Sequence, residues 1–113
     1  MELKATDLRV GNILNYDTSE GDTVTAVIDW QDIKWISEDP KGFNLVHSPI
    51  PLTEEWLEKF GKYKVSGYPY KFMIGFIKIR NGIYFFKYYN LEVDLPFVHN
   101  IQNLYHALSG QEL

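Results

Sequence analysis

The sequence FIKIRNGIYFFKYY, residues 76–89, carries the clearest structural signal in the chain. Its central pair, Asn81 and Gly82, separates two runs of β-branched and aromatic residues. This is the composition of a two-residue type I′ turn between antiparallel strands. Counting outward from the turn places Phe76 opposite Lys87. The stretch therefore predicts a long β-hairpin with a fixed register.

One face of this hairpin combines basic and aromatic side chains. Nucleic-acid sites use the same combination, because cations hold phosphates and aromatic rings stack on unpaired bases. In an alternative interpretation, a helix covers the rings while the basic side chains extend to water. We treat this face as the candidate nucleic-acid or partner face. Its residues are Phe76, Lys78, Arg80, Phe85, Lys87 and Tyr89.

The chain before residue 50 is expected to form strands. Residues 8–16 contain a Gly-Asn turn followed by apolar residues, and residues 23–30 are rich in β-branched side chains. Residues 33–36 and 43–46 are further apolar segments, separated by a loop-like composition at residues 37–42. Together these segments predict a small, strongly curved antiparallel sheet that could close into a barrel.

A short helix is predicted after the Pro-Ile-Pro segment at residues 49–51. Thr53 is a typical N-cap residue, and its hydroxyl can accept a hydrogen bond from the first turn. Glu54 and Glu55 follow at positions where carboxylates interact favourably with the helix dipole. Gly61 is expected to end this helix in a left-handed conformation.

A second, amphipathic helix is predicted between Pro96 and Gly110, because apolar residues recur there at helical spacing. Its opposite side carries His99, Asn103 and His106, which we interpret as a solvated face and, as a second choice, as a partner contact. The two histidines are about 10.5 Å apart along a straight helix, which is too far for one metal ion. No metal site is predicted.

These elements predict one α+β domain over residues 1–113, with the curved sheet and the hairpin packed by two amphipathic helices around one core. The chain has no cysteine, which excludes disulfides, thiolate nucleophiles and Cys-based metal sites. Charged residues interrupt residues 1–10, and no apolar run reaches the roughly 20 residues of a membrane span. We therefore expect a cytoplasmic protein with no membrane partner.

Charge is divided unevenly along the chain. Between Lys59 and Leu91 there are seven basic residues and no acidic ones, whereas all fifteen acidic residues and four basic ones lie elsewhere. Such segregation can produce a local field stronger than the net charge of −4 suggests.

Three stretches resemble a family of short uncharacterised proteins that recurs in the genomes and prophage-like elements of anaerobic gut bacteria. They are DLRVGN at residues 7–12, PIPLTEEWLEKFG at residues 49–61 and VHNIQNLYHALSGQEL at residues 98–113. The resemblance implies an accessory protein of a phage or mobile element. It implies no cofactor and no site residue.

No residue pattern indicates an enzyme. His47 and Ser48 are adjacent and would point apart in an extended chain, and Glu54, Glu55 and Glu58 suit a solvated helix. We therefore predict a non-catalytic binding or accessory protein without a cofactor. A protein partner is favoured over single-stranded nucleic acid, because the acidic part of the chain repels phosphates. Homo-oligomerisation is a third possibility, since a long hairpin exposes an edge that must be protected or paired.

Overall fold

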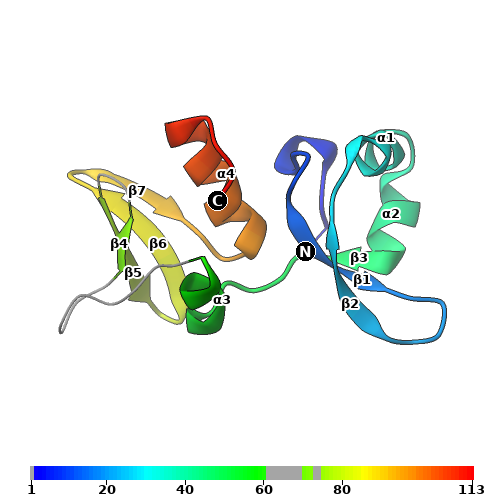
Figure 1. Ribbon diagram of the computed structural model, residues 1–113, viewed down its shortest axis with the longest axis horizontal. Coiled ribbons are helices and arrows are strands. Elements are labelled where there is room, and N and C mark those ends of the chain that lie inside the picture. The colour runs from blue at the N-terminus through cyan, green and yellow to red at the C-terminus, as the bar shows by residue number, and fades with distance from the viewer. Residues whose placement is uncertain (1, 61–69, 73–74) are drawn as a thin grey trace.

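The computed structural model describes residues 2–60, 70–72 and 75–113 (Figure 1). The protein is elongated, with extents of 44 × 27 × 24 Å, and helix α4 lies between two sheets (Figure 1). No helix in the described ranges has the length and apolar character needed to cross a membrane. The elements are η1 (Ala5–Asp7), β1 (Ile13–Asp17), β2 (Thr23–Val27), α1 (Trp30–Glu38), α2 (Pro40–Val46), β3 (His47–Ser48), α3 (Glu54–Lys59), β4 (Tyr70–Phe72), β5 (Gly75–Arg80), β6 (Ile83–Tyr88), β7 (Leu91–Asp94) and α4 (Val98–Ser109).

The fold is α+β, as the sequence predicts, and both sheets are antiparallel. The first sheet has the order β2-β1-β3, and α1 and α2 cover the side that faces away from α4 (Figure 1). The second sheet has the order β4-β5-β6-β7. Neither sheet closes into a barrel within the described residues.

The first sheet is smaller than predicted, because two expected strands are helices. Residues 33–36 belong to α1 and residues 43–46 to α2, so the predicted loop at residues 37–42 contains the end of one helix and the start of the next. The cause is local capping. The carboxylate of Asp29 accepts from the Asp32 amide at 3.0 Å, and the Asp32 carboxylate accepts from the Asp29 amide at the same distance. This reciprocal pair stabilises the first turn of α1 and overrides the strand preference of the isoleucines that follow.

Helix α2 begins on a similar signal. The Asp39 carboxylate accepts a 3.1 Å hydrogen bond from the Gly42 amide, and Pro40 occupies the first turn, where its missing N–H is not needed. The helix then brings Phe43 against the sheet. The buried members of this first apolar cluster are Leu3, Leu14, Ile28, Ile36 and Phe43.

The hairpin register predicted from the Asn81-Gly82 turn is confirmed. Phe76 pairs with Lys87, and the pairing continues without a bulge to the turn. Both turn residues are left-handed, with φ of 54° at Asn81 and 80° at Gly82, as a type I′ turn requires. Strand β7 then adds to the outer edge of β6 and extends the hairpin to a meander.

Gly75 starts β5 at a point where two strands approach closely. A Cβ atom on this residue would lie 2.4 Å from the carbonyl oxygen of Lys87 and 2.7 Å from the Phe86 ring. Both distances are shorter than a van der Waals contact. Glycine is therefore the residue that lets β5 begin directly against β6.

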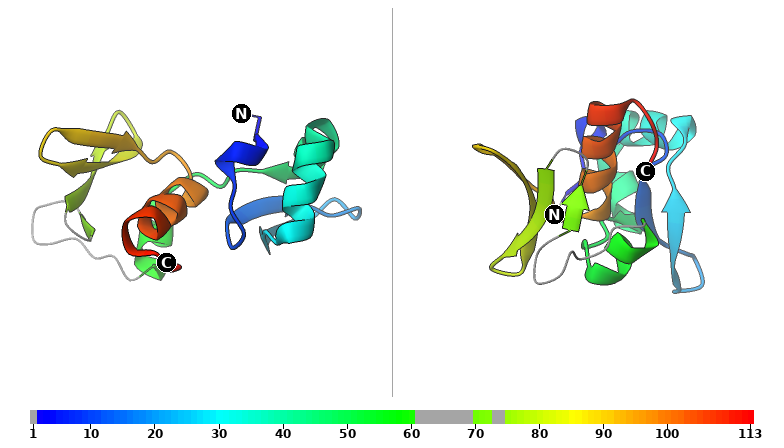
Figure 2. Two further views of the ribbon diagram at one scale, coloured as in Figure 1. Left: turned by 90° about the horizontal axis from the view of Figure 1, so that it is seen from above. Right: turned by 60° about the vertical axis from the view of Figure 1, so that its left-hand side comes forward.

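The second sheet is packed on one side by α3 and α4 (Figure 2). The predicted Thr53 cap of α3 is confirmed, since its hydroxyl accepts from the Trp56 amide at 3.4 Å. Gly61, the predicted end of α3, lies outside the described residues. Gly110 ends α4 with φ of 74°, also as predicted. The buried members of this second apolar cluster are Ile50, Leu52, Leu57, Ile77, Phe86, Leu95, Val98 and Ile101.

Among the described residues, the buried apolar side chains thus form two clusters, one for each sheet, where the sequence predicts one core. Helix α4 joins them. Its apolar side contributes Val98 and Ile101 to the second cluster, while Gln102 on another side bonds to β1. The prediction of one domain therefore depends on the polar contacts between α4 and the first sheet.

Candidate nucleic-acid interface

The structure brings most of the predicted face together. Phe76, Lys78 and Arg80 alternate along β5, and their partners across the hairpin include Phe85 and Lys87 of β6. These five side chains share the side of the sheet opposite to Ile77 and Phe86, which pack in the second cluster. In the described part of the chain, α3 and α4 cover only that opposite side (Figure 2). The interpretation in which a helix covers the basic and aromatic face therefore finds no support in these residues.

Phe85 is the exception within this face, because it is only 6% exposed. The guanidinium carbon of Arg80 lies 4.4 Å from the centroid of its ring, which is cation–π geometry. Arg80 therefore lies over the ring that was expected to stack on a base. Phe85 supports the Arg80 side chain, and the exposed aromatic surface comes from Phe76 and Tyr89.

Glu92 of β7 is a member of this face that sequence reasoning missed. Its carboxylate accepts from Nη2 of Arg80 at 3.1 Å and lies 3.7 Å from Nζ of Lys87. The hydrogen bond from Arg80 is the main reason that the pKa of Glu92 lies below its ordinary value. The signal that could have revealed it was the strand pairing after the Tyr89-Asn90 turn, which places Glu92 directly opposite Lys87.

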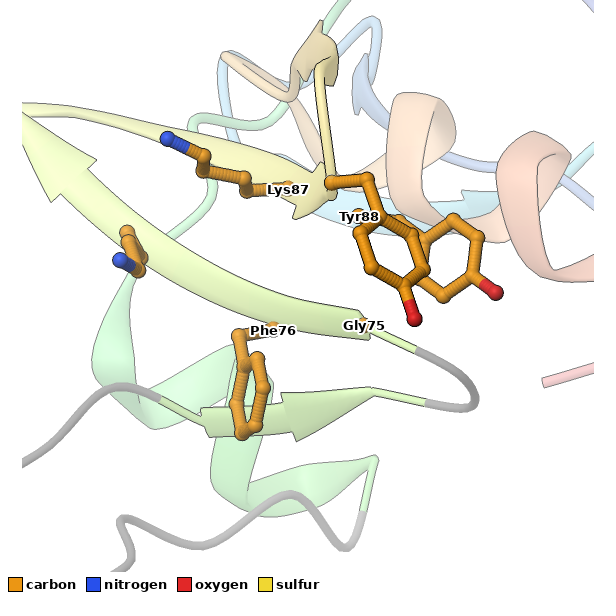
Figure 3. Close-up of a pocket in the computed structure, with 6 residues that line it drawn as sticks. Gly75, Phe76, Lys87 and Tyr88 are labelled. Carbon is orange, nitrogen blue, oxygen red and sulfur yellow. The ribbon is translucent and has the colours of Figure 1, made fainter.

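An open pocket of about 350 Å³ lies where β5 begins and β6 ends. Figure 3 shows Phe76, Lys87 and Tyr88 arranged around the backbone of Gly75 at this point. Lys78 and Tyr89 complete the lining. The pocket therefore combines two ammonium groups with three aromatic side chains.

The aromatic lining of the pocket is accessible. Phe76 is 45% exposed and Tyr89 is 80% exposed. Tyr89 begins the turn to β7 with φ of 53°, a left-handed conformation that is rare for a bulky residue. Its ring contacts the ring of Tyr88 edge-on, at a centroid distance of 4.6 Å. This contact helps to hold an exposed aromatic ring at the edge of the pocket.

Lys78 differs from the other two basic residues of the face. Arg80 and Lys87 are both engaged with Glu92, whereas Lys78 has no acidic partner among the described residues. Its side chain lies in the lining of the pocket. Lys78 is therefore the lysine of the pocket whose charge is not neutralised by a carboxylate of the described residues.

The acidic residues are concentrated away from this pocket. Residues 1–50 contain nine acidic and four basic residues, whereas residues 51–113 contain six acidic and seven basic ones. The first sheet and its helices lie at the opposite end of the 44 Å long axis from the second sheet (Figure 1). In physiological salt, the interaction between exposed charges is largely screened beyond about 8 Å. Repulsion from the acidic end is therefore weak at the pocket, which removes the main objection to a phosphate-bearing ligand.

The polar side of α4, which was predicted to face water, packs largely against the N-terminal segment. His99 is fully buried, so the prediction that it is solvated is wrong. Asn103 donates to the Asp7 carbonyl at 3.0 Å and accepts from the Asn12 side chain at 2.8 Å. His106 is half-buried. The reason is tertiary, because the N-terminal segment packs against this side of α4.

Four further contacts, made by Gln102 and Arg9, join the Asn103 bonds to form a seam between the C-terminal segment and the N-terminal segment. The Gln102 side chain donates to the Gly11 carbonyl at 3.1 Å and accepts from the Ile13 amide at 2.8 Å. Arg9 donates to the Gln102 carbonyl at 3.4 Å and forms an ion pair with Glu112. That bond lowers the pKa of Glu112 below its usual range. The seam contacts tie α4 and the residues that follow it to the N-terminal segment and to the start of β1.

The burial of His99 is expected to make the stability of the protein depend on pH. Neither of its ring nitrogens has a hydrogen-bond partner among the described residues. Burial lowers the pKa of His99, and the Asp7 carboxylate opposes that shift in part. An unfolded histidine titrates near 6.5, so below that pH the unfolded chain binds a proton that the folded protein does not. The free energy of unfolding should therefore be highest above about pH 6.5 and fall as the pH drops toward the lower pKa of the folded state.

The His99→Leu variant is expected to show a smaller pH dependence, because leucine cannot take up the proton. The measurement is urea unfolding at about pH 7.5 and about pH 5.5, where most carboxylates remain charged. Leu108→Ala, an exposed change on the same helix that removes no titratable group, is the control and should keep the dependence of the parent protein. An unchanged pH dependence in His99→Leu would contradict the assignment.

In the described residues no three His, Cys, Asp or Glu side chains come together as metal ligands. The Nδ1 of His47 bonds to the carbonyl of Phe43 at 3.0 Å, and its ring stacks on the Phe43 ring at 3.9 Å. Glu54, Glu55 and Glu58 are exposed on α3. These groups have structural explanations.

Comparison with protein-family models, with curated proteins and with solved structures finds no match to this chain.

Proposed function

We propose that the protein is a non-catalytic binding protein whose outer face on the second sheet holds a short segment of single-stranded nucleic acid. The observation that carries this proposal is the pocket, whose lining combines Lys78, which has no acidic partner in the described part of the chain, with the exposed rings of Phe76 and Tyr89. The role in a phage or mobile element rests on the resemblance of the three sequence stretches alone.

The chemistry of the pocket suits unpaired nucleotides better than an acidic peptide. A base offers a flat π surface to Phe76 or Tyr89, while its phosphate can meet Lys78. An acidic peptide would use the cations and leave the exposed rings without a matching surface. For this reason nucleic acid replaces a protein as the favoured partner.

The test is fluorescence anisotropy of labelled single-stranded DNA and RNA, each of about ten nucleotides, at low and at physiological salt. The parent protein is expected to bind with an affinity that falls as salt increases, because the counterions that binding releases from the strand gain less entropy in a concentrated salt solution. Lys78→Glu should weaken binding by about tenfold and lower the salt dependence. Phe76→Ala should weaken binding by the loss of a stacked base, about 1–3 kcal/mol, with little change in salt dependence.

Lys41→Glu provides the matched control. It makes the same charge change on an exposed lysine of α2, at the other end of the molecule, and should leave the affinity within about twofold. Circular dichroism confirms that the variants are folded. Absence of binding by the parent protein at low salt would overturn the proposal and return the search to a protein partner.

A further inference from the structure

We infer that Glu92 is a specificity-determining residue of this face, which disfavours duplex nucleic acid relative to single strands. The inference rests on the proposed function, since it concerns the ligand of the same face. Glu92 would weaken the binding of duplexes, whereas the pocket residues would favour the binding of duplexes and single strands alike.

The position of Glu92 is defined by contacts that cross three strands. Arg80 extends from β5 over the Phe85 ring of β6, at 4.4 Å, to reach Glu92 on β7 at 3.1 Å. Lys87 reaches the other carboxylate oxygen from β6 at 3.7 Å. One carboxylate thus engages two of the three basic residues that the hairpin presents on this face.

This arrangement limits how many phosphates the face can neutralise. Lys78 is left without an acidic partner in the described residues, whereas a phosphate at Arg80 or Lys87 has to compete with Glu92. Duplex DNA carries one charge per about 1.7 Å of its axis, so its affinity depends on several cations at once. A single strand carries fewer charges and gains binding free energy from base stacking, which does not require cations. The carboxylate therefore weakens duplex binding more than single-strand binding.

Asp94 provides a control on the same strand. It lies two residues from Glu92, pairs across the sheet with Phe85 and is exposed. No ion pair joins it to a basic residue of the described chain. A change at Asp94 therefore removes the same charge from the same side of β7 without releasing Arg80 or Lys87.

The experiment measures anisotropy of labelled single-stranded and duplex DNA of one sequence with the parent protein, Glu92→Gln and Asp94→Asn. Glu92→Gln is expected to raise duplex affinity about tenfold and single-strand affinity about threefold or less, with a steeper salt dependence for the duplex. Asp94→Asn should raise both affinities by a similar small factor. Thermal unfolding verifies that each variant is folded, as expected for changes at exposed ion pairs.

The outcomes separate the inference from the proposed function. If the parent protein binds single strands and Glu92→Gln leaves the ratio of single-strand to duplex affinity unchanged, the inference is wrong while the proposed function stands. The same conclusion follows if Asp94→Asn changes this affinity ratio as much as Glu92→Gln does, or if Glu92→Gln weakens the binding of both single strands and duplexes. If neither the parent protein nor Glu92→Gln binds single strands, both proposals fail.

Discussion

Replacing Phe43 with alanine is expected to lower the free energy of unfolding by about 3–5 kcal/mol. The ring is fully buried in the first apolar cluster and stacks on His47 at 3.9 Å with an interplanar angle of 7°. The Trp35 ring contacts it edge-on at a centroid distance of 5.5 Å. The loss combines the transfer of the ring to water with a cavity that these neighbours fill only in part.

Urea unfolding followed by Trp fluorescence measures this loss. Leu45→Ala is the matched control, because Leu45 lies two residues further along α2 and is 80% exposed. It should change the free energy of unfolding by no more than about 0.5 kcal/mol. The comparison also tests the secondary structure. In a strand, Phe43 and Leu45 would share one face, so similar losses for the two variants would contradict the helix.

Replacing Gln102 with alanine is expected to lower the free energy of unfolding by about 2–5 kcal/mol. The side chain is almost fully buried and satisfies both the Ile13 amide and the Gly11 carbonyl on the edge of β1. Alanine leaves these two half-buried backbone groups without the Gln102 side chain, and an unsatisfied group costs about 1–3 kcal/mol when it is buried. The same change removes a contact that couples the two apolar clusters.

Amide hydrogen exchange at Ile13 reports directly on this bond, and urea unfolding reports on its effect on stability. The Ile13 amide should exchange faster in Gln102→Ala than in the parent protein under native conditions. Gln31→Ala, on the exposed side of α1, is the matched control and should change neither measurement. A protected Ile13 amide in Gln102→Ala would show that another group forms this contact.

The predicted binding face shows which features of a surface a local sequence pattern can predict and which it cannot. The turn at Asn81 and Gly82 determined the register, and the register determined which side chains share a face with Phe76. Two properties of that face were missed, namely the cover of Arg80 over Phe85 and the carboxylate of Glu92. The first is a contact between two residues of the hairpin, which register alone does not reveal, and the second depends on β7, whose pairing is not encoded within the hairpin itself.

The prediction for residues 33–36 failed at the local level, although the decisive residues were present in the sequence. Aspartates at positions 29 and 32 form the reciprocal cap that starts α1. Strand propensity is weak and depends on context, whereas a cap satisfies backbone donors that otherwise have no partner. The spacing of these two aspartates was the better guide to this segment.

Local signals were enough to predict the hairpin register, the start of α3 at Thr53, the end of α4 at Gly110 and the α+β class, because turns, caps and strand alternation act over a few residues. The burial of His99 and the bond from Gln102 to β1 follow instead from the packing of α4 against the N-terminal segment. These outcomes depend on contacts between residues about ninety positions apart. Local periodicity shows that a helix side is polar, but it does not show whether water or another part of the chain satisfies that side.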